Sequence, residues 1–483
     1  MNLTGDPWIP VIYETGIHTL TLVSLNTLYA EAEKIRDLCA TPPQRIALMR
    51  LLICIAQRAL NGPEDERDWR SCRNCIGPMS TQYLQDHVEE FNLYGNQPFL
   101  QVDALQATSN AVTDKLDFGS SAGNNSVLFD HAANPDGRFH TPGWCALMLL
   151  TYQAFSPGGT IGEAKWSGIS TGRNSEHAPC VEGSMLHTII RGQNLLECIH
   201  LNLLTKKCIE ESTSFSWGRP TWEIEPKSRD EETLAELRTS YLGRLVPLSR
   251  GILLDGSGAR MTLANGLGYP KLPEAREPNA TVLLWKGKKE EHYSYLRTEP
   301  AKHPWRELAS LLTLSHRDGP GGALALRHLD ATRKTMVDIW TGGMKTEPGK
   351  AGKIQDVGEW MFSIPQSMLE SSALKRYEDG VELAGKAERA LSNGAKSYCE
   401  ALKMENTLGS QAKTHFWSTL DSSYPILLKA ANTSGVESAR LWFPVVRDAM
   451  NHAYEYACPH ETPRQIQAFA EGQRQLRLKK PDQ

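Results

Sequence analysis

Histidines and carboxylates are the side chains that most often carry acid–base or metal chemistry, and two short groups of them stand out in this sequence. His328 and Asp330 lie two residues apart, a spacing that suits one pair of metal ligands in a phosphohydrolase. The string His-Arg-Asp at 316–318 matches the start of a kinase catalytic loop. The first motif lacks the further ligands that would hold two ions, and the second lacks its later Asn, since Ala323 stands there. A metal-dependent nuclease or hydrolase acting on nucleic acid therefore remains only as an alternative.

Two other motifs are also incomplete. Gly158-Gly159 is not followed by the Gly-Lys-Ser/Thr of a phosphate-binding loop. Cys72 and Cys75 form a Cys-x-x-Cys pair, but no second pair and no ordered His pair completes a zinc site. We therefore expect no catalytic residue, no metal and no cofactor, which favours a binding protein over an enzyme.

Composition narrows the class of protein further. With 483 residues the chain is too long for one hydrophobic core, so we expect two or three domains. The net charge of −4 argues against a protein that coats nucleic acid by bulk charge, although local basic loops are still allowed. No signal-peptide pattern occurs, and no apolar run approaches the roughly 20 residues that span a bilayer. We expect a cytoplasmic protein that does not contact a membrane.

Three polar stretches that contain glycine are the best candidates for function, at 119–137, 156–183 and 342–353. Loops carry binding functions when a rigid body positions them. Glycine lets a backbone approach a ligand closely, and loop lysines and arginines suit phosphates. These stretches need a scaffold, so the elements around them matter.

The first 364 residues mix strand and helix patterns, which predicts a large mixed α/β domain over 1–364. Extended runs at 8–12 and 18–23 predict a hairpin. Ser24 is expected to begin a helix that runs to residue 38, and Pro42 to begin a buried one. We also expect helices over 142–155, 186–204 and 323–340, and a β-rich region over 215–300 with turns at Asp255-Gly256 and Asn265-Gly266.

After Pro365 the pattern becomes helical. Apolar residues recur with helical periodicity over 368–404, 411–431, 437–457 and 463–479, and only short breaks separate these segments. Four consecutive helices with short connections predict an up-down bundle over 365–483. The expected fold class is therefore α+β, with an all-α C-terminal four-helix bundle.

Several short strings resemble the CasA family, the large subunits of type I-E CRISPR Cascade complexes. They occur in the family's order across nearly the whole chain. They are Trp8-Ile9-Pro10-Val11, Pro98-Phe99-Leu100-Gln101, Arg191-Gly192, Asn194-Leu195, Asn202-Leu203, Pro220-Thr221-Trp222 and His415-Phe416-Trp417. The family fold is a mixed α/β domain with a C-terminal four-helix bundle, in agreement with the periodicity.

The resemblance implies a function in RNA-guided antiviral defence. Such subunits sit near the 5′ handle of the crRNA, recognise the protospacer-adjacent motif in double-stranded target DNA, and assist strand opening and R-loop formation. They also provide the docking surface for a helicase-nuclease effector. The implied partners are therefore the crRNA, the target duplex, the effector, and the backbone, small and handle-binding subunits of Cascade.

Two of the family's loops correspond to polar stretches of this chain. The loop at 119–131 resembles the one that contacts the crRNA handle and neighbouring subunits, with Asn124, Asn125, Leu128 and Phe129 as the candidate residues. The string Gly158, Gly159 and Thr160 resembles the glycine loop that lies against the DNA minor groove. Minor-groove readout is degenerate, so several related motifs would be tolerated.

Two further elements of the family correspond less closely. Arg260 is the candidate for the basic finger before Asn265-Gly266, with Lys271 as the fallback, and no lysine occupies the finger position itself. The strand-separating wedge follows Gly342-Gly343, and no glutamine occurs there before Gln355. Its candidate residues are Lys345, Thr346, Glu347, Pro348 and Lys350.

Overall fold

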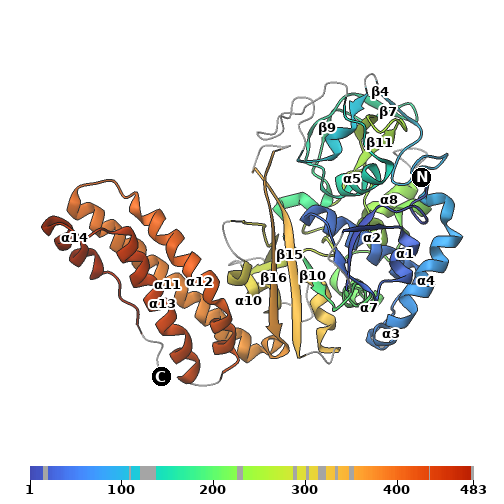
Figure 1. The fold of residues 1–483 in the computed structure, drawn as a ribbon. Helices are drawn as coiled ribbons and strands as arrows, with labels where there is room; N and C mark the ends of the chain where they lie inside the picture. The colour runs from blue at the N-terminus through green and yellow to red at the C-terminus, as the bar shows by residue number, and fades with distance from the viewer. Residues whose placement is uncertain are drawn as a thin grey trace. The chain divides into compact units, whose positions relative to one another are not determined.

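The structure, a computed structural model, describes residues 1–14, 20–107, 110–119, 137–225, 232–286, 291–300, 304–313, 322–331, 335–347, 353–433 and 436–479. The chain forms two compact units. Unit 1 comprises Met1–Ala301, Arg317–Arg333 and Val337–Phe362, and unit 2 comprises Lys302–His316, Lys334–Met336 and Ser363–Gln483. The expected fold class, a mixed α/β body followed by a helical region, is confirmed (Figure 1). The domain boundary at 364/365 stays a prediction.

The chain begins with a small antiparallel sheet in the order β2-β1-β3. Its strands are β1 (Ile9–Tyr13), β2 (Thr21–Val23) and β3 (Ile35–Leu38). The expected hairpin is confirmed by the pairing of β1 with β2. Ser24 caps α1 (Leu25–Ala30) as expected, but the predicted continuation to residue 38 is wrong. Residues 35–38 instead pair with β1, because strand pairing outweighs the helical pattern there.

Helices of unit 1 surround α2 (Pro42–Leu60), which is buried along most of its length, as its apolar sequence predicts. Thr41 and Gln44 form a capping box at its start, which satisfies backbone N–H groups that a helix leaves unpaired. The other helices of this unit are α3 (Glu66–Ser71), α4 (Arg73–Asp86), α5 (Pro142–Phe155), α6 (Leu195–Leu201), α7 (Lys206–Ser212), α8 (Glu232–Thr239) and α9 (Tyr241–Leu245).

Several short sheets carry the loops of interest. Their orders are β11-β12-β5, β4-β7-β8, β6-β9, β13-β14 and β10-β15-β16. α5 lies beside β11, because the side-chain amide of Gln153 donates to the Arg250 carbonyl at 2.8 Å (Figure 1). The strands are β4 (Leu105–Ala107), β5 (Ala111–Val112), β6 (Gly159–Thr160), β7 (Ala164–Trp166), β8 (Ile169–Ser170), β9 (Asn174–Ser175), β10 (His187–Arg191), β11 (Arg250–Leu254), β12 (Arg260–Asn265), β13 (Val282–Lys286), β14 (Glu291–Tyr295), β15 (Met336–Thr346) and β16 (Ile354–Pro365).

Two predicted helices are only partly confirmed, because part of each apolar run forms a strand. Residues 187–191 form β10, which pairs antiparallel with β15, and only α6 is helical in 186–204. Gly192 lies between β10 and α6. An added Cβ there would lie 2.6 Å from the backbone nitrogen of Cys198, so this close junction requires glycine. In 323–340, a 3-10 helix (Leu324–Ala331) precedes the start of β15. The loop expected from residue 342 is also wrong, because β15 continues to Thr346.

Unit 2 contains the four helices that the periodicity predicted, confirmed to within a few residues at most ends. They are α11 (Ser371–Leu402), α12 (Leu408–Ala431), α13 (Val436–Ala457) and α14 (Pro463–Gln473). α11 packs against the other three, and α12 also packs against α13. In the described part of the chain, no helix combines the length and the apolar character needed to cross a membrane.

Unit 2 also includes α10 (Leu308–Thr313) and the residues just before it, which the sequence did not associate with the bundle. Trp305 is 1% exposed and donates its indole N–H to Asp421 of α12 at 2.6 Å. The Arg306 guanidinium lies 3.6 Å from the ring centroid of Trp417, also on α12, and 3.6 Å from the Asp421 carboxylate. The hydroxyl of Tyr377 donates to the Trp305 carbonyl. These contacts attach the α10 segment to the bundle.

We expect Asp421→Ala to lower the free energy of unfolding of unit 2 by about 1–3 kcal/mol, because it leaves a buried indole N–H without its acceptor. Asp421→Asn keeps an oxygen acceptor and should lose less. Denaturant unfolding of the full chain measures both. Equal midpoints for the parent and both variants would show that this contact contributes nothing to stability.

Candidate nucleic-acid interface

The candidate glycine loop begins where α5 ends and forms β6, which pairs antiparallel with β9. The two glycines differ in their surroundings. A Cβ on Gly158 would lie 2.9 Å from the carbonyl oxygen of Ser175, so this position must be glycine for the two segments to approach. Gly159 has a φ of +146°, which side-chain-bearing residues rarely adopt, and nothing lies within 4 Å of its Cβ position. Gly158 therefore packs inward, and Gly159 faces open space next to the exposed Thr160.

A buried arginine stabilises the loop through hydrogen bonds to its backbone carbonyls. Arg250 of β11 is 2% exposed and donates to the carbonyls of Pro157 at 3.0 Å and Glu176 at 2.7 Å. The Ser175 hydroxyl donates to the Gly159 carbonyl at 2.9 Å. These bonds hold the carbonyls of Pro157 and Gly159, on either side of Gly158, and so fix the backbone that carries Gly159.

His177 completes the support of the loop. Its Nδ1 accepts the backbone N–H of Gly158 at 3.1 Å, so this nitrogen carries no proton. Burial lowers the pKa of the half-buried ring below its usual value. The positive charges of Lys271 and Arg250 lower the pKa further, and the carboxylates of Glu182 and Glu176 oppose them.

The structure brings Lys271 to the glycine loop. Its ammonium group lies 3.1 Å from the Glu182 carboxylate and 3.6 Å from that of Glu176, which immediately precedes His177. Burial disfavours the charge, but the two carboxylates outweigh it and raise the pKa of Lys271. The side chain of Lys271 is 44% exposed.

Arg260 lies elsewhere. It begins β12, opposite Val112 of β5, and Asn265 ends the same strand. Asn265 donates to the Asn174 carbonyl at 2.9 Å and so lies beside β9 and the glycine loop. Five residue steps along the strand separate Arg260 from Asn265 by about 16 Å. The structure therefore groups Lys271, and not Arg260, with Gly158 and Gly159.

The candidate wedge residues lie where β15 ends. Lys345 forms an ion pair with Glu299 at 2.7 Å. Thr346 is 9% exposed, and its backbone N–H and hydroxyl both bond to the Ser184 hydroxyl. Both side chains are thus engaged within unit 1.

The remaining candidate wedge residues follow along the chain. Glu347 donates its backbone N–H to the Lys353 carbonyl at 3.0 Å, which closes the hairpin between β15 and β16. Pro348 and Lys350 lie outside the described residues. The described part therefore consists of the two paired strands on either side of residues 348–352.

Asn124, Asn125, Leu128 and Phe129 of the candidate RNA-contact loop also lie outside the described residues, which resume at 137. The chain after this loop is firmly held. Asp114, 2% exposed, accepts the backbone N–H of Arg138 at 2.9 Å and contacts Nε2 of His140 at 3.1 Å. The His140 ring stacks on Trp144 with centroids 3.6 Å apart. Between these anchors Phe139 is 84% exposed.

The geometry around His328 does not resemble a metal centre. His328 is 4% exposed, and its ring stacks on Trp69 with centroids 5.5 Å apart. Burial lowers its pKa to about 4. Among the residues that the structure describes, no three His, Cys, Asp or Glu side chains gather as metal ligands would. The string at 316–318 lies outside these residues.

A serine-hydrolase spacing occurs at 119–123, which reads Gly-Ser-Ser-Ala-Gly. A nucleophile elbow of this kind follows a strand and precedes a helix. The element before it is instead a short 3-10 helix (Thr113–Leu116). The string therefore lacks the strand that such an elbow requires.

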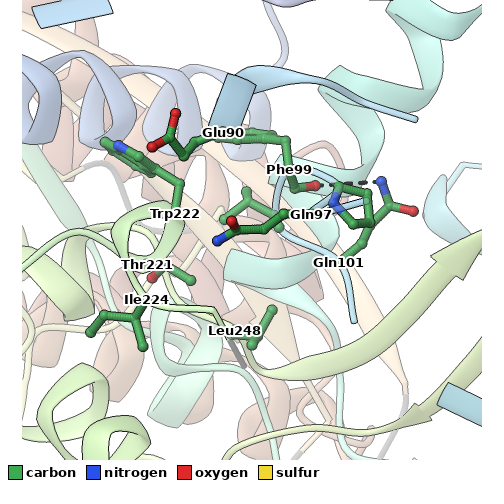
Figure 2. Close-up of a pocket in the computed structure, with 10 residues that line it drawn as sticks. Glu90, Gln97, Phe99, Gln101, Thr221, Trp222, Ile224 and Leu248 are labelled. Carbon is green, nitrogen blue, oxygen red and sulfur yellow. Dashed lines mark hydrogen bonds between the residues drawn. The ribbon is translucent and has the colours of Figure 1, made fainter. Parts of the chain in front are cut away.

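Two of the strings that carried the family resemblance meet in one pocket, at some of the most buried positions of unit 1 (Figure 2). The Phe99 and Trp222 rings lie 6.1 Å apart. Gln101 donates its side-chain amide to the Leu93 carbonyl and accepts the Leu254 N–H, each at 2.8 Å. These strings therefore hold the fold together, and the loops of interest lie outside them.

The sequence matches a known family along most of its length. The sequence model of the family described as CRISPR-associated protein Cse1 matches residues 2–453. CasA/Cse1 from Thermus thermophilus is 26% identical over 488 residues, which cover 94% of this chain and 91% of that protein.

Solved structures agree in fold. CasA from Thermus thermophilus and Cse1 from Thermobifida fusca each superpose with a TM-score of 0.79 at 21% identity, covering 99% of this chain and 98% of theirs. A chain of a CRISPR RNA-guided surveillance complex gives 0.77 at 16% identity, covering 99% of both chains. At these identities the likeness shows the fold alone. Because the family match spans residues 2–453, this chain belongs to the CRISPR-associated protein Cse1 family, whose members are also called CasA.

Proposed function

We propose that this chain is the large subunit of a type I-E Cascade, an RNA-guided surveillance complex, in which it reads the protospacer-adjacent motif and is not itself an enzyme. The observation that carries the proposal is the glycine loop of a Cse1-family chain. Its backbone is fixed by Arg250, Ser175 and His177, while Gly159 faces open space. A rigid backbone without a side chain can enter a minor groove about 6 Å wide.

Charge near the loop favours DNA as its ligand. Lys271 is tied to two carboxylates yet still 44% exposed, so a phosphate or a base edge could replace one of these partners. Gly158, Gly159, Thr160 and Lys271 therefore form the proposed motif-reading group. Arg260 is assigned to the same duplex at a separate position, at the other end of β12 from Asn265, about 16 Å along the strand.

The other two candidate sites have different functions. The hairpin of β15 and β16 is proposed to act as the strand-separating wedge, and its candidate residues are Lys345, Thr346, Glu347, Pro348 and Lys350. A wedge of this kind assists R-loop formation by unstacking base pairs.

The loop at 119–131 is proposed to contact the crRNA handle and neighbouring subunits through Asn124, Asn125, Leu128 and Phe129. An apolar side chain there can fill a partner pocket or stack on a base. The subunit as a whole is proposed to act in the cytoplasm and to dock the helicase-nuclease effector.

Co-purification tests the proposal. The tagged chain, expressed with the products of its neighbouring genes, is expected to recover a defined complex that contains one RNA species of uniform length. The isolated acidic chain is expected to bind duplex DNA weakly and to lose that binding as salt rises. Recovery of no RNA, or tight salt-insensitive binding by the chain alone, would contradict the proposal.

The same preparations address the alternative. If the isolated chain cut DNA with Mg²⁺ or Mn²⁺, and His328→Ala abolished the cutting, the protein would be a metal-dependent nuclease. We expect no cleavage, because the His328 ring is stacked and buried.

A further inference from the structure

The backbone N–H of Gly158 donates to the titratable ring of His177. We propose that His177 is a positioning residue of the glycine loop: its unprotonated ring holds the Gly158 N–H and thereby sets the backbone path that presents Gly159 to the duplex. The inference rests on the proposed function of the loop. It adds a residue that touches no ligand and acts only through the loop.

The geometry leaves little freedom for any other path. The Gly158 nitrogen lies 3.1 Å from Nδ1 of His177. The Cβ position of Gly158 is 2.9 Å from the Ser175 carbonyl oxygen and 3.1 Å from the His177 nitrogen. The Ala178 N–H bonds to the Ser156 carbonyl at 2.8 Å, so the two segments are joined on either side of the ring. Loss of the ring contact would leave the Gly158 amide without this partner at the point where the loop turns outward.

The contact requires a neutral ring. Protonation would place a proton on Nδ1 and turn two donors toward each other. Four charged groups face the ring. They are Arg250 in β11, Lys271 after β12, Glu182 in the 3-10 helix Pro179–Ser184, and Glu176 directly after β9. The cations disfavour protonation and the carboxylates favour it. With burial as the largest cause, the pKa of His177 lies below its usual value of 6.5.

The sign of the pH dependence follows from this direction. A histidine with a lowered pKa in the folded state contributes its stabilisation above the ordinary value and loses it as the pH falls through the lowered one. The loop should therefore be fully ordered at neutral pH. Motif discrimination should weaken only in acid, below about pH 6.5.

Two substitutions distinguish the loss of the hydrogen-bond acceptor from the protonation of the ring. Asparagine offers Oδ1 at the branch position of Nδ1 and does not titrate. In the assembled complex, His177→Asn should retain the parent's ratio of affinities for duplexes with correct and scrambled motifs at pH 7.5, and keep it down to about pH 5. His177→Leu removes the acceptor and should reduce the ratio about tenfold at every pH. The parent should match His177→Asn at neutral pH and approach His177→Leu in acid.

A second measurement does not depend on DNA. Amide hydrogen exchange of the peptide over 156–161 in the full chain reports the Gly158 bond directly. At neutral pH, exchange there should be at least tenfold faster in His177→Leu than in the parent, and unchanged in His177→Asn. If His177→Leu fails to fold, the pH profile and the exchange of His177→Asn carry the test.

Each outcome decides one question. An acid loss of discrimination that is identical in the parent and His177→Asn would overturn the positioning role, as would unchanged exchange and unchanged discrimination in His177→Leu. If the parent complex does not distinguish motifs at pH 7.5, the proposed function fails. The exchange data would then still show whether His177 holds the loop.

Discussion

Replacing Glu277 with alanine is expected to lower the free energy of unfolding of the mixed α/β body by about 3–5 kcal/mol, the largest loss that we expect from a single substitution in this chain. Glu277 is fully buried between two arginines. Its carboxylate accepts from Arg50 of α2 at 2.9 Å and from Arg244 of α9 at 2.7 Å, and both guanidinium groups are almost inaccessible to water. Removal of the carboxylate would leave two buried positive charges without their shared partner.

The same triad predicts a pH dependence. Burial alone would raise the pKa of Glu277, but the charges of Arg244 and Arg50 outweigh it and hold the pKa below its usual value. A carboxylate of this kind stabilises the fold above its unfolded pKa, about 4.3, and that stabilisation is lost as the pH falls through the lowered folded value. The parent should therefore lose stability more steeply in acid than Glu277→Ala does.

Denaturant unfolding at about pH 7 and about pH 3 measures both effects. Glu277→Gln is the matched control, because it keeps the shape and an oxygen acceptor but removes the charge, and it should fall between the parent and the alanine variant. If Glu277→Ala unfolds within about 1 kcal/mol of the parent at neutral pH, the triad is not holding α2 to α9.

Gly158→Ala is expected to reduce the preference of the assembled complex for the correct motif by about 1–3 kcal/mol, the range of one lost base contact. Its new methyl group would lie 2.9 Å from the Ser175 carbonyl oxygen and would displace the loop. Gly159→Asp should lose as much for two other reasons. It strains a φ of +146° and places a carboxylate where phosphates approach.

Two control variants make the comparison specific. Gly162→Ala lies in the same exposed segment, and nothing lies within 4 Å of its Cβ position, so it should bind like the parent. Gly159→Asn has the same backbone strain as Gly159→Asp without its charge, so the difference between them isolates repulsion. Competition binding with correct and scrambled duplexes measures all four. Equal losses of motif preference in Gly162→Ala and Gly158→Ala would mean that any substitution in this segment disrupts the loop.

The helical region was predictable because its period persists over long segments. In 368–404 the apolar positions keep one face for about ten turns, so the assignment of α11 could hardly fail. The run at 186–204 offered no such signal. A short apolar strand followed by a short helix reads as one buried helix, and only the pairing of β10 with β15 distinguishes them. The prediction of a loop from residue 342 failed for a different reason, because Gly342 and Gly343 resemble a loop in sequence but lie within β15.

The sequence identified the glycine loop of the candidate site, but not which other residues lie beside it. Gly158 and Gly159 were found from composition and resemblance. The choice between Arg260 and Lys271 depends on which end of β12 lies beside β9, and no local pattern contains that information. His177 was missed because it acts on a residue nineteen positions earlier. A histidine two residues after a short strand in a glycine-rich stretch is the signal that could have drawn attention to it.

The central claim is that this chain supplies motif recognition to an RNA-guided complex. The most direct test compares the complex assembled with and without the chain, using duplexes that share one complementary target and differ only in the adjacent motif. Our account predicts that the complete complex binds the correct duplex at least tenfold more tightly than the scrambled one, and that the preference disappears without the chain. Equal discrimination by both complexes would contradict the claim, because the motif would then be read by another subunit.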